Sequence, residues 1–590
     1  MKLAVTLCCL FLATPLAVAQ STLNVPAQFA TIQGAIVAAV NGDTVVVQPG
    51  TYIETIDFLG KAITVRAALG AATTIIDANQ TGVVARFLTA ETPASVLDGF
   101  TLRNGLGTAT GQAGGIDAVA SSPTIRNCLV TNCAGALGGA GGMRIQNGAP
   151  LVVDTRFVGN TGGGGQTTVC FGPFSSSQGG PGGAGAIGIQ APTAGLLIDR
   201  CMFESNVGGA GGTGICGSFL AYGGLGGAGA VSITSTAPVP ISRCVFRGNT
   251  GGAGGIGNGY PNGIAGNGGP GALGAVFSFA FGSLSLTLVG CVFIANAGGP
   301  GAAMTPPGYG GDGAVMTTGV ALIGIHLTVT ANVAGPNNLG GSGGVRHGGT
   351  MFSSANFGNC IFWGNFSNGA PQDLYGSGLA SFSTNCDIGV SNANVGPGNI
   401  SVDPQFVNVA AGDIHLGAAS PCRNVGTLSA GLPPFDIDGD PRIVGPLPDM
   451  GADEIDALVG TREDLVLEFR VNGVVPASIP NASIAAGQAG AAVITSPTGT
   501  FAAAFVFLVG ELYTPPAVPF PPPSLPEVHI STGASILATI PGLGAGGFAI
   551  AGVVPPGLSG LAVRLQAMAP LANGVNGIFA ASAARDVLFL

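Results

Sequence analysis

Six charged side chains in the middle of the chain have types and spacings that suit ligand binding or catalysis. They are Asp154, Arg156, Arg200, Glu204, Arg243 and Arg247. Guanidinium groups bind carboxylates in a bidentate manner, so one interpretation is a groove for an acidic polysaccharide. A lyase at this groove would need an arginine base and Ca²⁺ held by carboxylates. The third interpretation is a set of cross-strand ion pairs on a solvated face, which we favour over catalysis.

A second candidate site is the run of acidic residues at Asp436, Asp438 and Asp440. Acids at alternate positions occur in calcium-binding loops, so Ca²⁺ is the candidate ion here. However, Gly439 comes too early for an EF-hand, and no glutamate follows at the distance that such a loop requires. We therefore favour a turn stabilised by aspartate hydrogen bonds over a calcium site.

A phrase that recurs through the middle of the chain gives the six charged residues a common geometry. The phrase is a cysteine or apolar residue, a variable residue, a phenylalanine or apolar residue, and then an asparagine. Its clearest copies begin at Cys201, Cys244, Cys291 and Cys360 and end at Asn206, Asn249, Asn296 and Asn365. A period of two is that of a strand whose alternate side chains enter a core. Because the phrase is constant while its spacing varies, the sequence predicts a parallel β-solenoid with insertions.

In such a solenoid the first and third residues of each phrase form inner ladders. Asparagine tolerates left-handed backbone dihedrals, which suits the bend that ends a strand, so we expect the asparagines to form an outer ladder. The residues just before, between and just after the inner pair then point outward. This alignment places the six charged residues on one face of neighbouring coils.

The cysteines fall into separate classes by their place in the coils. Those at the inward position are predicted to be free thiols, because in-register neighbours hold their Cβ atoms about 4.8 Å apart, beyond disulfide reach. They are Cys128, Cys201, Cys244, Cys291 and Cys360. Cys170 and Cys216 each lie 10 residues after the asparagine of their coil, so we predict a disulfide between adjacent loops. Cys386 and Cys422 form a second candidate pair, and Cys133 has no assignment.

The ends and the insertions of the solenoid have distinct sequences. Residues 25–39 have apolar residues at helical spacing, with Thr31 as the candidate N-cap, and are predicted to form a helix that caps the open end. Gly-rich tracts such as 162–185 and 208–229 are predicted to form compact loops packed along one side. Over residues 457–590 the phrase is absent, and short strands with Pro and Gly turns suggest a small antiparallel β-sandwich domain.

Residues 1–19 have the pattern of a signal peptide, with Lys2, an apolar run and Ala17-Val18-Ala19, and cleavage is predicted after Ala19. No later apolar run is long enough to span a bilayer. The chain has 28 acidic against 18 basic residues, a formal net charge of −10, which argues against a nucleic-acid-binding surface. We expect a monomer that is secreted or held at the cell surface.

Two stretches resemble the opening of bacterial right-handed parallel β-helix proteins of the pectin-lyase-like group: TIQGAIVAAVNGDTVVVQPGTYIETIDFLGKAITVRA at 31–67 and LDGFTLRNG at 97–105. Two others are similar to the segment that closes such helices: SPCRNVG at 420–426 and DIDGDPRIVGPLPDMGADE at 436–454. The resemblance covers roughly residues 24–456 and implies an all-β fold, a right-handed parallel β-helix over 20–456.

That group includes lyases, hydrolases and adhesins, so the resemblance leaves the activity open. The outward positions lack a dense cluster of carboxylates. We therefore expect an exported, non-catalytic scaffold for adhesion or for binding a polysaccharide or cell-surface glycan. The alternative is a lyase or hydrolase that acts on an acidic polysaccharide.

Overall fold

The computed structural model describes residues 20–589 with internal gaps, so the predicted signal peptide lies outside the described residues. The gaps are 171–175, 217–219, 236, 259–267, 280–284, 304–307, 337–340, 349–353, 378–380, 392–393, 418, 429–431, 440–441, 444–446, 455–465, 472–480, 486–487, 496–505, 514–534, 541–547, 554–561, 571–578 and 582–584.

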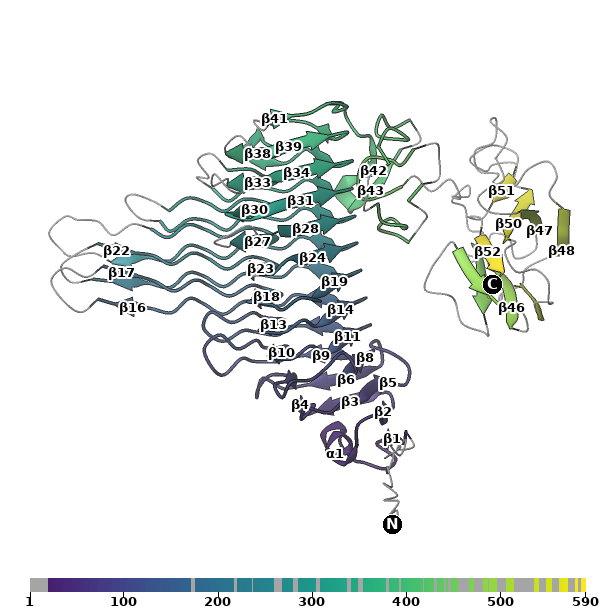
Figure 1. Cartoon of the computed structure of the whole chain (residues 1–590), viewed down its shortest axis with the longest axis horizontal. Helices are drawn as coiled ribbons and strands as arrows, with labels where there is room; N and C mark the ends of the chain where they lie inside the picture. Colours follow the sequence, from purple (N-terminus) through teal and green to yellow (C-terminus); the bar gives the residue numbers. More distant parts are fainter. Residues whose placement is uncertain are drawn as a thin grey trace, which may run out of the picture.

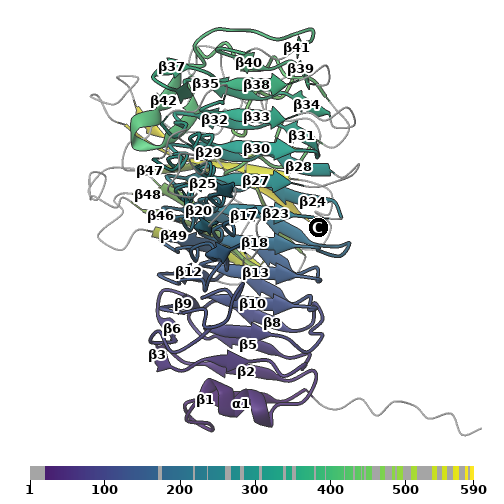
Figure 2. The same ribbon diagram turned by 90° about the vertical axis from the view of Figure 1, so that its left-hand side faces the viewer.

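Three long sheets, in which neighbouring strands run parallel, form the body of the molecule, and a full coil gives one strand to each sheet (Figure 1). Sheet A has 13 strands: β1 Thr22–Val25, β2 Thr44–Val47, β5 Thr64–Ala67, β8 Val96–Asp98, β11 Thr124–Arg126, β14 Leu151–Val153, β19 Leu197–Asp199, β24 Val239–Ser242, β28 Ser285–Val289, β31 Ala321–Ile325, β34 Ala355–Gly358, β39 Ser381–Thr384 and β41 Asn394–Val395. Sheet B has 11: β3 Gly50–Ile53, β6 Thr74–Asp77, β9 Thr101–Arg103, β12 Leu129–Thr131, β15 Arg156–Val158, β20 Met202–Glu204, β25 Val245–Arg247, β29 Val292–Ile294, β32 Thr328–Thr330, β35 Ile361–Trp363 and β40 Asp387–Ile388. Sheet C, which stacks from bottom to top of Figure 2, has 10: β4 Ile56–Asp57, β7 Ala85–Phe87, β10 Ile116–Val119, β13 Met143–Gln146, β18 Ile187–Gln190, β23 Val231–Thr234, β27 Val276–Phe279, β30 Val315–Thr318, β33 Val345–Gly348 and β38 Leu374–Ser377. The predicted parallel β-helix is confirmed.

Two buried ladders from the repeated phrase line the interior, as its spacing predicts. The first is Phe100, Cys128, Thr155, Cys201, Cys244, Cys291, Leu327, Cys360 and Cys386, and the second is Leu102, Val130, Phe157, Phe203, Phe246, Phe293, Val329, Phe362 and Ile388. The rings of Phe203, Phe246 and Phe293 stack at centroid distances of 4.6 Å. The five cysteines predicted to be free thiols are free. Burial raises the pKa of Cys128 to about 12, so this thiol stays protonated and unreactive.

Six of the asparagines form a third inner ladder, so for them the prediction of an outer ladder was wrong. Asn104 and Asn132, which are not buried and have φ values of 55° and 52°, do lie at the left-handed bend. The fully buried members of the inner ladder are Asn160, Asn206, Asn249, Asn296, Asn332 and Asn365. The side-chain amide of Asn249 donates to Oδ1 of Asn296 and to the main-chain carbonyl of Phe203, both at 2.9 Å. The left-handed residue of the bend is the one before, such as Gly248 with φ 60°, so the asparagine itself turns inward. Cys133 occupies the ladder position below Asn160 and donates its main-chain N–H to that side chain.

The helix α1 (Ile32–Ala38) covers the first coil, as predicted for a cap, but it is shorter than the predicted 25–39, because Val25 ends β1 and the helix begins only after Thr31. Thr31 accepts a hydrogen bond from the N–H of Gly34, and Ile32, Ala35 and Ile36 are buried. The Glu54 carboxylate accepts from the first free N–H groups of the helix, and the ammonium of Lys61 donates to carbonyls at its last turn. Among the described residues, no helix has the length and apolar character needed to cross a membrane.

The Gly-rich tracts leave the coils between sheets B and C and stack into a projection, here called the fin, whose described residues are 161–170, 176–185, 207–216, 220–229, 250–258, 268–274, 297–303 and 308–313 (Figure 1). Each tract has an outgoing and a return leg, and hydrogen bonds alternate between them. Gly209 N–H donates to Gly183, Gly227 N–H to Gly209, and Gly252 N–H to Gly227. Short strands extend the legs: β16 Thr168–Val169, β21 Gly214–Ile215 and β26 Gly257–Asn258 form one sheet, and β17 Ser177–Gln178 and β22 Ala221–Tyr222 another.

The legs of the fin repeat every three residues, as in Gly223-Gly224-Leu225-Gly226-Gly227. A three-residue repeat whose hydrogen bonds run between segments is characteristic of packed polyproline II helices. The close approach of the legs explains the glycines, because a Cβ atom on Gly227 would lie 1.9 Å from the carbonyl oxygen of Gly183.

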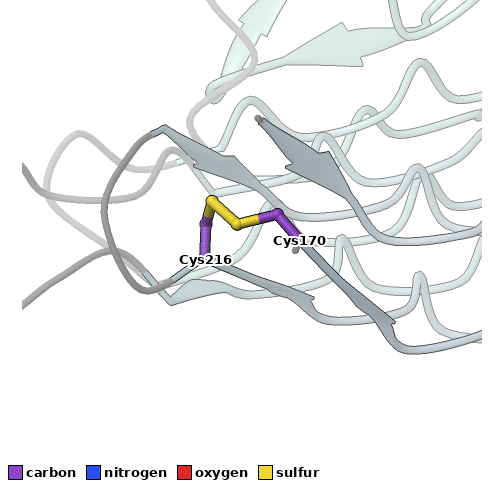
Figure 3. The surroundings of a disulfide bond; sticks show 2 residues. All are labelled: Cys170 and Cys216. Carbon is purple, nitrogen blue, oxygen red and sulfur yellow. A yellow bond between two sulfur atoms is a disulfide. The ribbon is translucent and has the colours of Figure 1, made fainter. Parts of the chain in front are cut away.

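The predicted disulfide between Cys170 and Cys216 is present, with Cα atoms 5.0 Å apart, and joins two neighbouring legs of the fin (Figure 3). The second predicted pair is wrong, because Cys386 and Cys422 are both free. Cys386 points into the coils as the last member of the first ladder. Cys422 packs on the outer face of sheet B with Ile361 and Met450, so the wall of the coil separates the two sulfur atoms.

After the last coil, the described residues of 399–454, here called the closing segment, fold back over the outer face of sheet B. The segment contains β42 Phe406–Asn408, the 3-10 turn η1 Val409–Ala411 and β43 Asp413–Leu416, and a small hairpin of β36 Phe366–Ser367 and β37 Ala370–Pro371 precedes it. Ile414 and Ala452 pack against Val292 and Ile294 of sheet B. Outward positions of the later coils are therefore covered, which the repeat pattern alone does not indicate.

The C-terminal strands form two sheets around a core of their own. The first sheet contains β44 Val466–Val471, β46 Ala489–Thr495 and β49 Phe548–Val553; the second contains β45 Asn481–Ile484, β47 Val506–Tyr513, β48 Ser535–Ile540, β50 Ala562–Pro570, β51 Phe579–Ala581 and β52 Arg585–Phe589. Leu467 and Ile494 from one sheet pack with Leu508 and Leu565 from the other, which is the arrangement of a β-sandwich. One pair, β45 with β52, is parallel, so the sandwich is mixed rather than purely antiparallel.

Candidate functional site

Four of the six predicted charged residues pair with one another on the outside of the coils. Nε and Nη2 of Arg200 lie 2.6 and 2.7 Å from the carboxylate oxygens of Asp154, a bidentate ion pair. Nη2 of Arg156 lies 3.4 Å from Oε2 of Glu204. Each guanidinium group is thus already matched by a carboxylate of the neighbouring coil.

Arg243 and Arg247 have partners outside the predicted set. Nη2 of Arg243 and Nη1 of Arg200 each lie 2.6 Å from Oδ2 of Asp199. Arg247 donates to the main-chain carbonyl of Gly412 in the closing segment, at 3.1 Å. Sequence reasoning missed Asp199 because it compared positions no further than one residue before each phrase. An alignment extended by one residue would have found it.

The tight bends between sheets A and B direct three of these side chains outward. Asp154, Arg200 and Arg243 have φ values of 48°, 51° and 47°, in the left-handed region that the tight bend between sheets A and B requires. The hydrogen-bonded carboxylate of Asp154 raises the pKa of Arg200 above its usual range. A lyase base must lose its proton, and this pairing opposes that loss.

A second candidate site, here called the groove, lies on the outer face of sheet C beside the fin. The parallel register aligns the outward residues of successive strands in one row: Arg144, Gly188, Ser232, Phe277, Met316 and Arg346. The two residues of this row with the smallest side chains, Gly188 and Ser232, lie between the longer side chains of Arg144 and Phe277. A cavity of about 340 Å³ occupies this place, and a second of about 280 Å³ continues past Phe277.

The fin supplies the wall of the groove. Pro181, Leu225, Pro270 and Tyr309, which are equivalent residues of four return legs, line the two cavities. On the floor, Phe279, Thr234 and Gln190 lie beside the row of outward residues. The groove therefore has an apolar wall and a floor that mixes aromatic and polar groups.

An arginine stands at each end of the groove. Nε and Nη2 of Arg144 lie 2.7 and 2.9 Å from the two carboxylate oxygens of the buried Asp117. At the other end, Nη1 of Arg346 lies 3.7 Å from Asp312, and its guanidinium carbon is 5.7 Å from the centre of the Tyr375 ring. Both arginines are fixed by these contacts.

The sequence prediction did not include this groove, because the repeated phrase marks only the strands of sheet B. The strands of sheet C come directly after Gly-rich tracts of unequal length, which breaks the simple alignment. The available signal was the apolar alternation that follows each tract, as in Ile187–Gln190 and Val276–Phe279.

Of the acidic run at 436–440, the structure describes Asp436 and Asp438, and these two side chains have different partners. Asp436 is buried, and its oxygens accept hydrogen bonds from the main-chain N–H groups of Asp438 and Glu454, as in the turn that the sequence favours. Asp440 lies outside the described residues. Asp438 points instead to Nε2 of His415, at 3.1 Å.

Comparison with models of known families, and a search of curated proteins, found nothing similar to this chain.

Proposed function

We propose that the protein is an exported, non-catalytic β-helix that binds a glycan chain in the groove between sheet C and the fin. The supporting observation is the floor of the groove, where Gly188 and Ser232 leave an open cavity between Arg144 and Phe277. Sites for ligands are concave, largely pre-formed and lined by apolar groups with a few polar groups. The groove has these properties.

The chemistry of the lining favours a carbohydrate. Phe277 and Phe279 offer apolar faces on which sugar rings can stack, and Ser232, Thr234 and Gln190 offer hydroxyl and amide groups for hydrogen bonds. From Arg144 to Arg346 the groove spans five strand spacings, about 24 Å, which suits an oligosaccharide rather than a single sugar.

Arg144 favours a sugar that carries a carboxylate. Asp117 engages its Nε and Nη2 atoms, and the contacts of the described residues leave Nη1 free to bind an anionic oxygen at the end of the groove. The alternative function, a lyase or hydrolase, has less support. Of the predicted residues, the carboxylates Asp154 and Glu204 are each paired with an arginine rather than placed as an acid and a base.

The test uses the chain that lacks residues 1–19. Uronic-acid oligosaccharides and neutral oligosaccharides are titrated into it, and binding is measured by calorimetry. We expect Ser232→Trp, which fills the floor, to abolish binding, and Phe277→Ala to weaken it about 2- to 10-fold through lost stacking. Arg156→Ala, on sheet B, is the matched control and should bind as the unmodified chain does. Unchanged binding by Ser232→Trp would refute the groove. Release of unsaturated products in the presence of Ca²⁺ would establish the lyase instead.

A further inference from the structure

Three residues with metal-binding side chains converge in the closing segment. His415 comes from β43, Asp438 from the turn after Asp436, and Asp453 from the last turn of the segment. Each offers one ligand atom, and these atoms all lie within 4.8 Å of one another. The residues are separated in sequence, so the fold brings them together.

The carboxylate of Asp453 is buried without a strong partner. The residue is 3% exposed, and the only hydrogen bond it receives from the described residues is a long one, 3.4 Å from the N–H of Leu416. A buried carboxylate is costly unless a cation or several hydrogen bonds compensate it. The positive charges near Asp453 are those of Arg442, whose guanidinium donates to the carbonyls of Gly451 and Ala452, and of His415 when it is protonated. A cation bound directly to the carboxylate would compensate it further.

A fourth residue orients the imidazole of His415. Oδ1 of Asp413 lies 2.5 Å from Nδ1 and accepts the hydrogen bond that fixes the proton on that nitrogen. In the neutral imidazole with that tautomer the lone pair is on Nε2, which lies 3.1 Å from Oδ2 of Asp438; without a metal, Nε2 carries a proton and donates to this carboxylate. A carboxylate behind a histidine, with carboxylates in front of it, is the usual outer arrangement of a metal-bound histidine.

We propose that His415, Asp438 and Asp453 bind a divalent transition-metal ion, with Zn²⁺ as the best match. Imidazole is a ligand for zinc and its neighbours, whereas calcium and magnesium prefer oxygen ligands alone. Three protein ligands leave a further coordination position for water. This site includes Asp438 of the acidic run in which the sequence offered Ca²⁺ as the less favoured candidate, and it is independent of the glycan groove.

The ion would act as a staple on the closing segment. Its ligands come from β43, whose residue Ile414 packs on sheet B, and from two turns that follow later in the same segment. A metal that bridges them stabilises the folded segment by mass action. Without a metal, the rival arrangement is a protonated His415 held between the carboxylates of Asp413 and Asp438.

The experiment is a Zn²⁺ titration of the chelator-treated chain without residues 1–19, by calorimetry and by thermal melting. We expect one equivalent to bind and the melting temperature to rise. His415→Gln and Asp438→Asn, both at exposed positions, should abolish binding. Asp413→Asn should weaken it about 10- to 100-fold, as loss of an orienting partner does.

Asp403→Asn is the matched control, because this aspartate lies in the same segment outside the cluster. It should bind Zn²⁺ as the unmodified chain does. The proposal fails if the unmodified chain binds no zinc, which leaves the protonated histidine as the explanation. It fails equally if both His415→Gln and Asp438→Asn still bind one equivalent, since the ion then lies elsewhere.

Discussion

The interior of the coils and the fin are made by the same turns of one chain, yet different atoms hold them together. In the interior, successive coils contact one another through buried side chains, such as the stacked rings of Phe203 and Phe246 and the amide ladder through Asn249. In the fin, the contacts are main-chain hydrogen bonds between glycines, such as Gly227 to Gly209 at 2.7 Å. Contacts between side chains therefore hold the interior of the coils together, whereas the close packing of the fin is possible because its glycines have no side chains.

The two regions should therefore respond differently to mutation. Loss of a buried side chain leaves a cavity or an unpaired polar group in the shared core of the coils, and every probe of folding should detect it. Addition of a side chain to the fin forces two legs apart, while the core beneath keeps its contacts. In a stack of repeats each unit interacts mainly with its neighbours, so such damage remains local.

The largest effect is expected from Asn249→Ala. Asn249 accepts from the main-chain N–H and the side-chain amide of Asn206, and donates to Asn296 and Phe203. Its loss leaves several buried groups without partners, each worth about 1–3 kcal/mol, so we expect the free energy of unfolding to fall by about 4–6 kcal/mol. Urea unfolding followed by circular dichroism measures this. Asn258→Ala, at an exposed position of the fin, should have almost no effect; equal losses would remove the distinction between the regions.

Phe246→Ala should follow closely. Phe246 stacks between Phe203 and Phe293, and truncation of a buried phenylalanine costs about 3–5 kcal/mol. Phe277→Ala, on the outer face of sheet C, is the control for the same change outside the core. The same unfolding curves check both variants. A loss for Phe277→Ala as large as that for Phe246→Ala would mean that the outer face contributes to stability as the interior does.

A smaller global effect is expected from Gly227→Ala. The added Cβ would approach the Gly183 carbonyl to 1.9 Å, so the legs must separate, and hydrogen exchange of the nearby fin amides should accelerate. The unfolding midpoint of the coils should change little. Gly164→Ala is the control within the same fin, because its Cβ would meet only the Ala210 carbonyl, at 3.8 Å. Fast exchange in both variants would show that the fin does not depend on close contacts of its glycines.

The comparison also explains what could be predicted from the sequence. The interior ladders have a period of two and a constant phrase, so Cys201 and Phe203 could be placed inside the coil from their spacing alone. The asparagine ladder could not, because the same residue suits both a left-handed bend and a buried hydrogen-bonded position. Only the geometry of the turn, with Ser205 rather than Asn206 at positive φ, decides between them.

The candidate sites were harder to predict for a related reason. The row from Arg144 to Phe277 depends on the register of sheet C, whose strands follow insertions of unequal length. The convergence of His415, Asp438 and Asp453 depends on how the closing segment folds back, which no repeat encodes. Asp438 could be selected from the acidic run, but its partner could not.

The smallest effect on overall stability is expected from loss of the disulfide. Cys170 and Cys216 lie 46 residues apart in sequence and join two legs that main-chain hydrogen bonds already hold together, such as Cys170 N–H to Ile215. In the double variant Cys170→Ser, Cys216→Ser we expect the unfolding midpoint of the coils to stay within error, because the crosslink constrains only the fin. Amides of β16 and β21 should nevertheless exchange faster, since opening of the legs no longer has to overcome the crosslink. Exchange measured by mass spectrometry on the oxidised, reduced and double-variant chains tests this, and the reduced chain should match the variant. A fall in the coil midpoint comparable to that of Phe246→Ala would show that the fin and the core unfold as one unit, and the contrast between the two regions would then be one of chemistry but not of stability.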